Sequence, residues 1–141
     1  MADEALAREF TTRFVRCDVP GLVDMFTPNA VYHDVFYGTF EGHDAIRGMF
    51  ETFFQAGKDY VWEWTKLIAG RDAIAGEGHF GFTSTQNGKV ARFDLVSIFE
   101  VEGGKIAGYR EYFDFGRALL QTGVDPAAVG KIIQRRMDRG Q

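Results

Sequence analysis

The chain has 141 residues, 45% of them hydrophobic and 26% charged, which is the balance of one folded domain with its own core. Its net charge of −4 excludes the basic surface that nucleic-acid binding requires. The single cysteine, Cys17, excludes an intrachain disulfide and a cysteine-based zinc cluster.

The N-terminal residues are acidic and lack the apolar centre of a signal peptide, and no apolar run approaches the length that spans a bilayer. We therefore expect a cytoplasmic protein without membrane contact. The 14 phenylalanines predict a core or ligand pocket with aromatic walls.

The first third of the chain alternates helical and extended patterns. Apolar residues at helical spacing predict a helix over 3–16, and a second, short helix over 21–26 ends at Thr27-Pro28. The run 30–37 predicts a strand, followed by a turn-rich segment over 38–42. A third helix begins at His43 and stops at Gly57.

From residue 59 onward the pattern is β-rich, which predicts an antiparallel meander over 59–68, 73–85, 90–101 and 106–115. Asn87-Gly88 and Gly103-Gly104 predict its hairpin turns. Three glycines within one strand, Gly76, Gly78 and Gly81, predict bulges or sharp curvature. Residues 117–141 form a helical tail whose basic face we interpret as solvated. The whole, 1–141, is a single α+β domain with a sheet curved around its helices.

Alternation places a carboxylate among aromatic residues on each of two strands. Tyr32 and Asp34 share a face of the first strand, and Glu111 shares one with Tyr109 and Phe113 on the last. Burial of an unpaired carboxylate is costly, so either the two form an acid/base pair or both are structural. In the structural interpretation, Asp34 caps a turn and Glu111 pairs with an arginine: Arg47, Arg92 or Arg110.

His79 is a further candidate with two interpretations. Alternation points it away from Phe80 and Phe82, toward solvent, whereas a bulge at Gly78 or Gly81 would turn it into a pocket. The three histidines lack metal-ligand spacing, so we expect no metal site.

Two segments resemble a known family: A-V-Y-H-D-V-F-Y-G-T-F-E-G-H-D-A-I and F-D-L-V-S-I-F-E-V-E-G-G-K-I-A-G-Y-R-E-Y-F-D. Together they resemble the SnoaL-like branch of the NTF2-like superfamily, which is similar to ketosteroid isomerases, limonene epoxide hydrolases and polyketide cyclases. The resemblance implies a cone: a curved antiparallel sheet around N-terminal helices, with a hydrophobic pocket at the open end.

The resemblance also implies roles for single residues. Asp34 matches the general base of the isomerases, while Phe10 and Ser97 occupy the positions of their oxyanion-hole tyrosine and acid. Tyr32 and Glu111 match the tyrosine and the base that hold and deprotonate water in the epoxide hydrolases. In dehydratase-like relatives a histidine from the region of His79 is the base.

The sequence thus predicts cofactor-free acid/base chemistry on a hydrophobic cyclic molecule, by isomerisation, cyclisation, dehydration or epoxide hydrolysis. The predicted catalytic residues are Asp34, Glu111, Tyr32 and His79. The predicted pocket lining is Phe10, Phe14, Phe50, Phe54, Phe80, Phe82, Phe93, Leu95, Ser97, Tyr109 and Phe113. The alternative is a non-catalytic ligand-binding or protein-association module of the same fold. In either case we expect a homodimer formed through the sheet.

Overall fold

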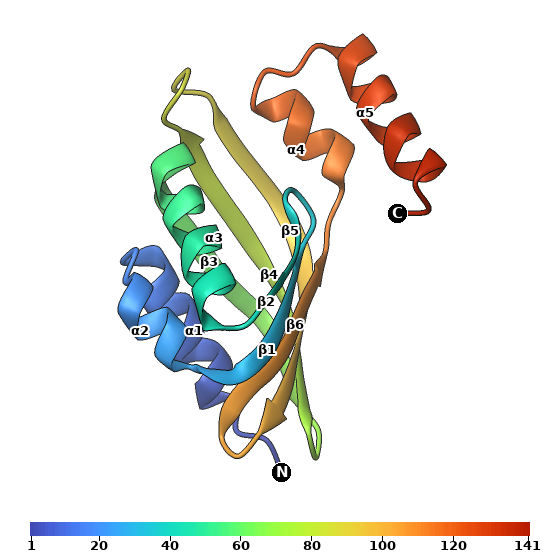
Figure 1. Ribbon diagram of the computed structural model, residues 1–141. Coiled ribbons are helices and arrows are strands. Elements are labelled where there is room, and N and C mark those ends of the chain that lie inside the picture. Colours follow the sequence, from blue (N-terminus) through green and yellow to red (C-terminus); the bar gives the residue numbers. More distant parts are fainter.

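Three helices of the N-terminal half pack against one face of a curved sheet, and two C-terminal helices lie beyond one end of it (Figure 1). The computed structural model describes residues 1–141. The elements of the N-terminal half are α1 (Ala5–Val15), α2 (Val19–Asp24), β1 (Phe26–Asp34), β2 (Gly38–Glu41) and α3 (His43–Ala56). The remaining elements are β3 (Gly57–Ala69), β4 (Ala73–Ser84), β5 (Val90–Glu102), β6 (Lys105–Tyr112), α4 (Phe115–Gln121) and α5 (Pro126–Asp138).

The six strands follow the order β2-β1-β6-β5-β4-β3, so the long meander is closed by the first strand of the chain. All neighbouring pairs are antiparallel except β1 and β6, which run parallel and place Tyr32 beside Tyr109 and His33 beside Arg110. This parallel pairing brings residues far apart in sequence onto neighbouring strands at one end of the sheet. The predicted α+β cone is confirmed.

Two glycines of β4 allow β3 to approach it closely. A side chain at Gly76 would clash with the ring of Trp64, and one at Gly78 would clash with the carbonyl oxygen of Glu63. The register between the strands shifts between Trp64 and Lys66 on β3, opposite these glycines. The predicted irregularity is therefore present, but the extra residue is on β3, and β4 keeps an unbroken register with β5.

The space between helices and sheet is filled by aromatic rings. Phe10 of α1 is fully buried at the centre and contacts rings from every side, with centroid distances of 5.4 Å to Trp62, 5.3 Å to Phe99 and 5.5 Å to Tyr109. The first two pairs are edge-to-face and the third is stacked, and pairs at these distances add to the large area that each ring buries. This packed layer lies under the pocket described below and fixes the strands that carry its residues.

Strand β1 begins four residues earlier and ends three residues earlier than the strand predicted over 30–37, and the segment after it is not merely a turn. Residues Gly38–Glu41 form β2 and pair with Val31–Asp34. Strand β1 begins at Phe26 and includes Pro28, at a place where the pairing with β6 is interrupted between Phe26 and Val31. Proline has no N–H to donate to a sheet, so it is accommodated where the ladder is irregular.

The C-terminal tail folds back onto the molecule. Arg92 donates its backbone N–H to the side chain of Gln121, joining α4 to β5. On α5, Arg136 donates to the carbonyl oxygens of Val35 and Phe36, 101 and 100 residues earlier. Its guanidinium also lies 3.9 Å from the ring centroid of Phe115. The prediction of a merely solvated basic face is therefore wrong for Arg136.

The outer face of the sheet is polar with scattered apolar residues. Val96 and Tyr112 are exposed there, at 38% and 61%, near the paired side chains of His79 and Asp94. The homodimer through this face stays a prediction. None of the helices combines the length and apolarity needed to cross a membrane.

Candidate functional site

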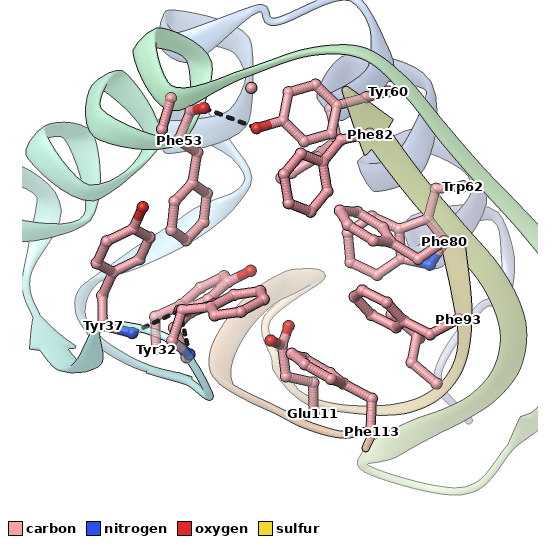
Figure 2. Close-up of a pocket in the computed structure, with 16 residues that line it drawn as sticks. Tyr32, Tyr37, Phe53, Tyr60, Trp62, Phe80, Phe82, Phe93, Glu111 and Phe113 are labelled. Carbon is pink, nitrogen blue, oxygen red and sulfur yellow. Dashed lines mark hydrogen bonds between the residues drawn. The ribbon is translucent and has the colours of Figure 1, made fainter. Parts of the chain in front are cut away.

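One pocket opens between α3, the inner face of the sheet and the turn that joins β1 to β2 (Figure 2). It is lined by 16 residues, 13 of them hydrophobic. The cavity volume is about 60 Å³, and the empty space is about 520 Å³ when the open mouth is counted. The pocket is therefore narrow, and a ligand that enters without rearrangement is small. The lining residues are Phe14, Tyr32, Asp34, Phe36, Tyr37, Phe53, Ala56, Gly57, Tyr60, Trp62, Phe80, Phe82, Phe93, Leu95, Glu111 and Phe113.

Asp34 is the last residue of β1, and its side chain is 9% exposed. Its Oδ2 atom accepts hydrogen bonds from the backbone N–H groups of Phe36 and Tyr37, both at 2.9 Å. Burial raises the pKa of this carboxyl, while the two N–H donors, the Glu111 carboxyl and the charge of Arg136 act to lower it. The predicted turn cap is therefore present, and it leaves the carboxyl at the pocket wall.

Glu111 points into the pocket from β6 (Figure 2). Its Oε1 accepts from the hydroxyl of Tyr109 at 2.9 Å, and its Oε2 lies 3.5 Å from the backbone nitrogen of Val35. Burial raises its pKa well above the ordinary range, and the charge of Asp34 and a hydrogen bond to it raise the pKa further. The pKa of Glu111 is thus raised further than that of Asp34, and the two carboxyls titrate as a coupled pair.

No arginine bridges to Glu111, in contrast to the structural interpretation of the sequence. Arg110 pairs with Glu100 at 3.1 Å and Arg47 with Asp44 at 2.9 Å, and Arg92 makes no ion pair. The two carboxyl groups are thus coupled to one another rather than to a cation. When two carboxyl groups share a site, the pKa of one of them is strongly raised.

A line of hydroxyl groups supports Glu111 from within the core. The hydroxyls of Ser97 and Tyr109 lie 2.9 Å apart, and Tyr109 donates onward to Glu111. The ring of Tyr32 stacks on that of Tyr109 at 4.4 Å. Burial raises the pKa of both phenols well above 10, with the charge of Glu111 adding to it. Both tyrosines therefore stay protonated over any working pH, and Tyr32 lines the pocket as a hydrogen-bond donor.

The structure divides the predicted lining residues into a wall and a layer behind it. Those at the wall are Phe14, Phe80, Phe82, Phe93, Leu95 and Phe113. Those behind it are Phe10, Phe50, Phe54, Ser97 and Tyr109, which belong to the core or support it. Alternation assigns a residue to the inner face of a strand or helix, but it does not tell the wall of a cavity from the packing beneath it.

Seven lining residues were not predicted: Phe36, Tyr37, Phe53, Ala56, Gly57, Tyr60 and Trp62. Phe53 lies on the apolar face predicted for α3, so it could have been included. Trp62 of β3 is 7% exposed at the pocket wall. Phe36 and Tyr37 belong to the strand predicted over 30–37, but β1 ends at Asp34 and both lie in the turn after it, where strand alternation no longer sets the direction of a side chain.

His79 does not belong to this site. Its ring is exposed on the outer face of β4, with Nδ1 2.5 Å from a carboxylate oxygen of Asp94. The register of β4 with β5 is unbroken through His79, so the alternation that points it outward is not reversed. Its inclusion among the catalytic residues is corrected.

The pocket wall carries two carboxyl groups, those of Asp34 and Glu111, and no lysine, arginine or histidine lines it. No group of three or more His, Cys, Asp or Glu side chains is arranged to hold a metal ion. The indole Nε1 of Trp62 is buried without a hydrogen-bond partner. The arrangement can accept a proton at Asp34, supply one from Glu111, and donate a hydrogen bond from Tyr32.

A comparison with known protein families assigns the chain to one of them. Residues 7–109 match the SnoaL-like domain, and the chain belongs to that family. Helices α4 and α5 lie beyond the matched residues. No curated protein matches the sequence.

Solved structures agree on the fold. A protein with a ketosteroid isomerase-like fold from Catenulispora acidiphila, in complex with trimethylamine, is 16% identical with a TM-score of 0.80, covering 90% of this chain and 98% of that one. An NTF2-like protein of unknown function from Burkholderia pseudomallei is 21% identical with a TM-score of 0.77, covering 84% and 95%. The epoxide hydrolase/cyclase-like enzyme SalBIII is 25% identical with a TM-score of 0.71, covering 79% and 90%.

Proposed function

We propose that this protein is an enzyme that performs cofactor-free acid/base chemistry on a small hydrophobic molecule bound in the aromatic pocket. The observation that carries the proposal is the pair formed by Asp34 and Glu111, which share a hydrogen bond at the pocket wall and have no cationic partner there. Burial of such a pair is unfavourable, and its raised pKa values bring proton transfer toward neutral pH.

In the proposed reaction Asp34 takes a proton from the substrate or from a water, and Glu111 gives its proton to a substrate oxygen. The pair thereby moves one proton in and one out, so its total charge is the same before and after the step. Tyr109 and Ser97 support Glu111 when it becomes charged, because the Tyr109 hydroxyl already donates to it at 2.9 Å. Tyr32 donates to the oxygen on which negative charge develops.

Of the reactions expected from the sequence, the Asp34–Glu111 pair best fits those that make or break a carbon–oxygen bond. Epoxide opening and ring closure each need a base for one hydroxyl or water and an acid for one oxygen, and Asp34 and Glu111 provide both. The relative SalBIII, described as acting in pyran ring formation in the polyether salinomycin, supports this choice. The oxyanion hole expected in a ketosteroid isomerase has no counterpart, since Phe10 is fully buried and Ser97 is bonded to Tyr109.

A second candidate is a non-catalytic module that binds the same kind of ligand. The observation in its favour is the double hydrogen bond from Phe36 and Tyr37 to Asp34, which gives that carboxylate a structural task. The two candidates differ in what Asp34→Asn does, because an amide keeps an oxygen that accepts these N–H groups but cannot act as a base.

The test is turnover of a panel of small epoxides, hydroxy-epoxides and enones, followed by mass spectrometry. Wild type should convert at least one compound, and Asp34→Asn and Glu111→Gln should each lower kcat by about 10²-fold or more. Asp94→Asn, on the outer face, is the matched control and should be unchanged. If Asp34→Asn turns over at the wild-type rate, or if compounds bind without turnover, the enzyme proposal fails and the binding module is favoured.

A further inference from the structure

We propose that the pocket binds a compact organic cation, an alkyl-substituted ammonium group, seated between aromatic rings with its charge directed at Asp34 and Glu111. This names the chemical class of the occupant and rests on the proposed function only in using the same pocket. Binding of such a ligand is measurable whether or not catalysis follows.

The walls provide the first argument. Apart from the two carboxyls, the lining is almost entirely aromatic, and Figure 2 shows the labelled rings around a common space into which the Glu111 carboxyl points. These rings hold one another in place: Phe80 lies 5.1 Å from Trp62 and 5.4 Å from Phe93, which stacks on Phe113 at 4.4 Å. The negative faces of such rings attract a cation, and burial from water strengthens that attraction.

Charge provides the second argument. Two carboxyls lie at the wall, and no basic side chain does, so an anionic ligand would be repelled. Arg136 is the cation whose charge acts on Asp34. Its guanidinium already donates hydrogen bonds to the carbonyl oxygens of Val35 and Phe36 and lies against the ring of Phe115. Arg136 acts on Asp34 from outside the pocket, whereas a cation that enters it would place a counter-charge on the inner side of the pair, where the wall has none, and it would stabilise the ionised form.

Size provides the third argument. With a cavity volume of about 60 Å³, the interior holds a compact head group and not a fused ring system. A trimethylammonium group is round and small, and its methyl groups are apolar enough to contact rings on all sides. Substituents on the nitrogen would extend toward the mouth, where Tyr37 is 49% exposed.

The experiment compares choline with its uncharged analogue 3,3-dimethylbutan-1-ol, which replaces the nitrogen by carbon and keeps the shape. Isothermal titration calorimetry on the full chain should show choline binding more tightly by at least about tenfold, the least expected from ring faces and carboxylates in a desolvated site. Asp34→Asn and Glu111→Gln should reduce this preference, and Asp94→Asn should leave it unchanged.

A second variant separates the rings from the carboxyls. Phe80→Leu keeps an apolar wall but removes one ring, so it should weaken choline binding and leave the binding of the alcohol within about twofold. Equal affinity of wild type for choline and the alcohol, or no binding of choline, would overturn the inference. Neither result would touch the proposed acid/base role, which is decided by turnover in Asp34→Asn.

Discussion

Arg136 gives the sharpest stability prediction, because a single side chain of α5 holds the turn that carries the pocket rim. Its guanidinium donates to the carbonyls of Val35 and Phe36 and packs on Phe115. On the inner side of the same turn, the N–H groups of Phe36 and Tyr37 are bonded to Asp34. The turn is therefore fixed from both sides, by a cation outside and a carboxylate inside.

The expected loss can be worked from these contacts. Two hydrogen bonds from a charged donor at a half-buried site contribute about 1 kcal/mol each, and the ring contact adds about 0.5–1 kcal/mol. Arg136→Gln should thus destabilise the fold by about 2–3 kcal/mol, which for a domain of this size lowers Tm by about 8–12 °C. Arg136→Lys should retain part of this, because an ammonium lacks the planar pair of donors.

Thermal unfolding monitored by circular dichroism measures this loss of stability. The matched control is Arg135→Gln, since Arg135 is exposed and makes no ion pair. Amide hydrogen exchange should rise at Phe36 and Tyr37 in the Arg136 variant and not in the control. If Arg136→Gln melts within about 1 °C of Arg135→Gln and the two amides exchange as in wild type, the reasoning about this turn is refuted.

Two further predictions concern the pair of carboxyls and the close strand contact. Because the pKa values of Asp34 and Glu111 are raised, the folded state keeps protons at pH values where the unfolded chain has already released them. The stability that this contributes is full below the ordinary pKa range of carboxyls, and it is lost as pH rises through the raised pKa values. Each unit of raised pKa corresponds to about 1.4 kcal/mol of stability. In urea unfolding from pH 4 to 8, the free energy of unfolding of Glu111→Gln should therefore increase relative to that of wild type as pH rises. A difference between the two that stays constant with pH would contradict the raised pKa values. Gly78→Ala should destabilise the fold by about 2–4 kcal/mol, because the added methyl group would clash with the carbonyl oxygen of Glu63. The control Gly48→Ala, at an α3 position with open space around it, should be neutral or stabilising. Equal denaturation midpoints for the two variants would show that β3 moves to make room for the methyl group.

Much of the fold follows from local patterns that act over a few residues. Asn87-Gly88 and Gly103-Gly104 predict the two hairpins because glycine at Gly88, Gly103 and Gly104 adopts the positive φ that such turns need. Period-2 alternation places Tyr32 and Asp34 inward and His79 outward, as found. The family resemblance adds the curved sheet around the helices, but the parallel pairing of β1 with β6 was not predicted, because no local pattern contains it.

The features that sequence reasoning missed depend on contacts between distant segments. Arg136 belongs to a helix that looks ordinary and basic, and only the folded-back tail brings it to Val35 and Phe36. Strand β2 is short and contains little apolar sequence, so its pairing with β1 defines it more than its composition does. The pairing of Asp34 with Glu111 was one of two interpretations of the sequence, and the choice between them depends on the register across β1 and β6, which a single sequence does not specify.

The parallel pairing of β1 with β6 has a consequence for how the molecule folds. The hairpins of β3–β6 join neighbouring segments, but the contact between Val35 and Glu111 spans 76 residues. Closing so long a loop costs chain entropy before any contact compensates for it. The seam, by which we mean the pairing of β1 with β6, is therefore expected to form late in folding and to open early in unfolding. The two carboxyls lie on opposite sides of that seam. The pocket chemistry therefore exists only in a fully closed chain, and a partly folded molecule with an intact meander would carry neither a paired Asp34 nor a protonated Glu111.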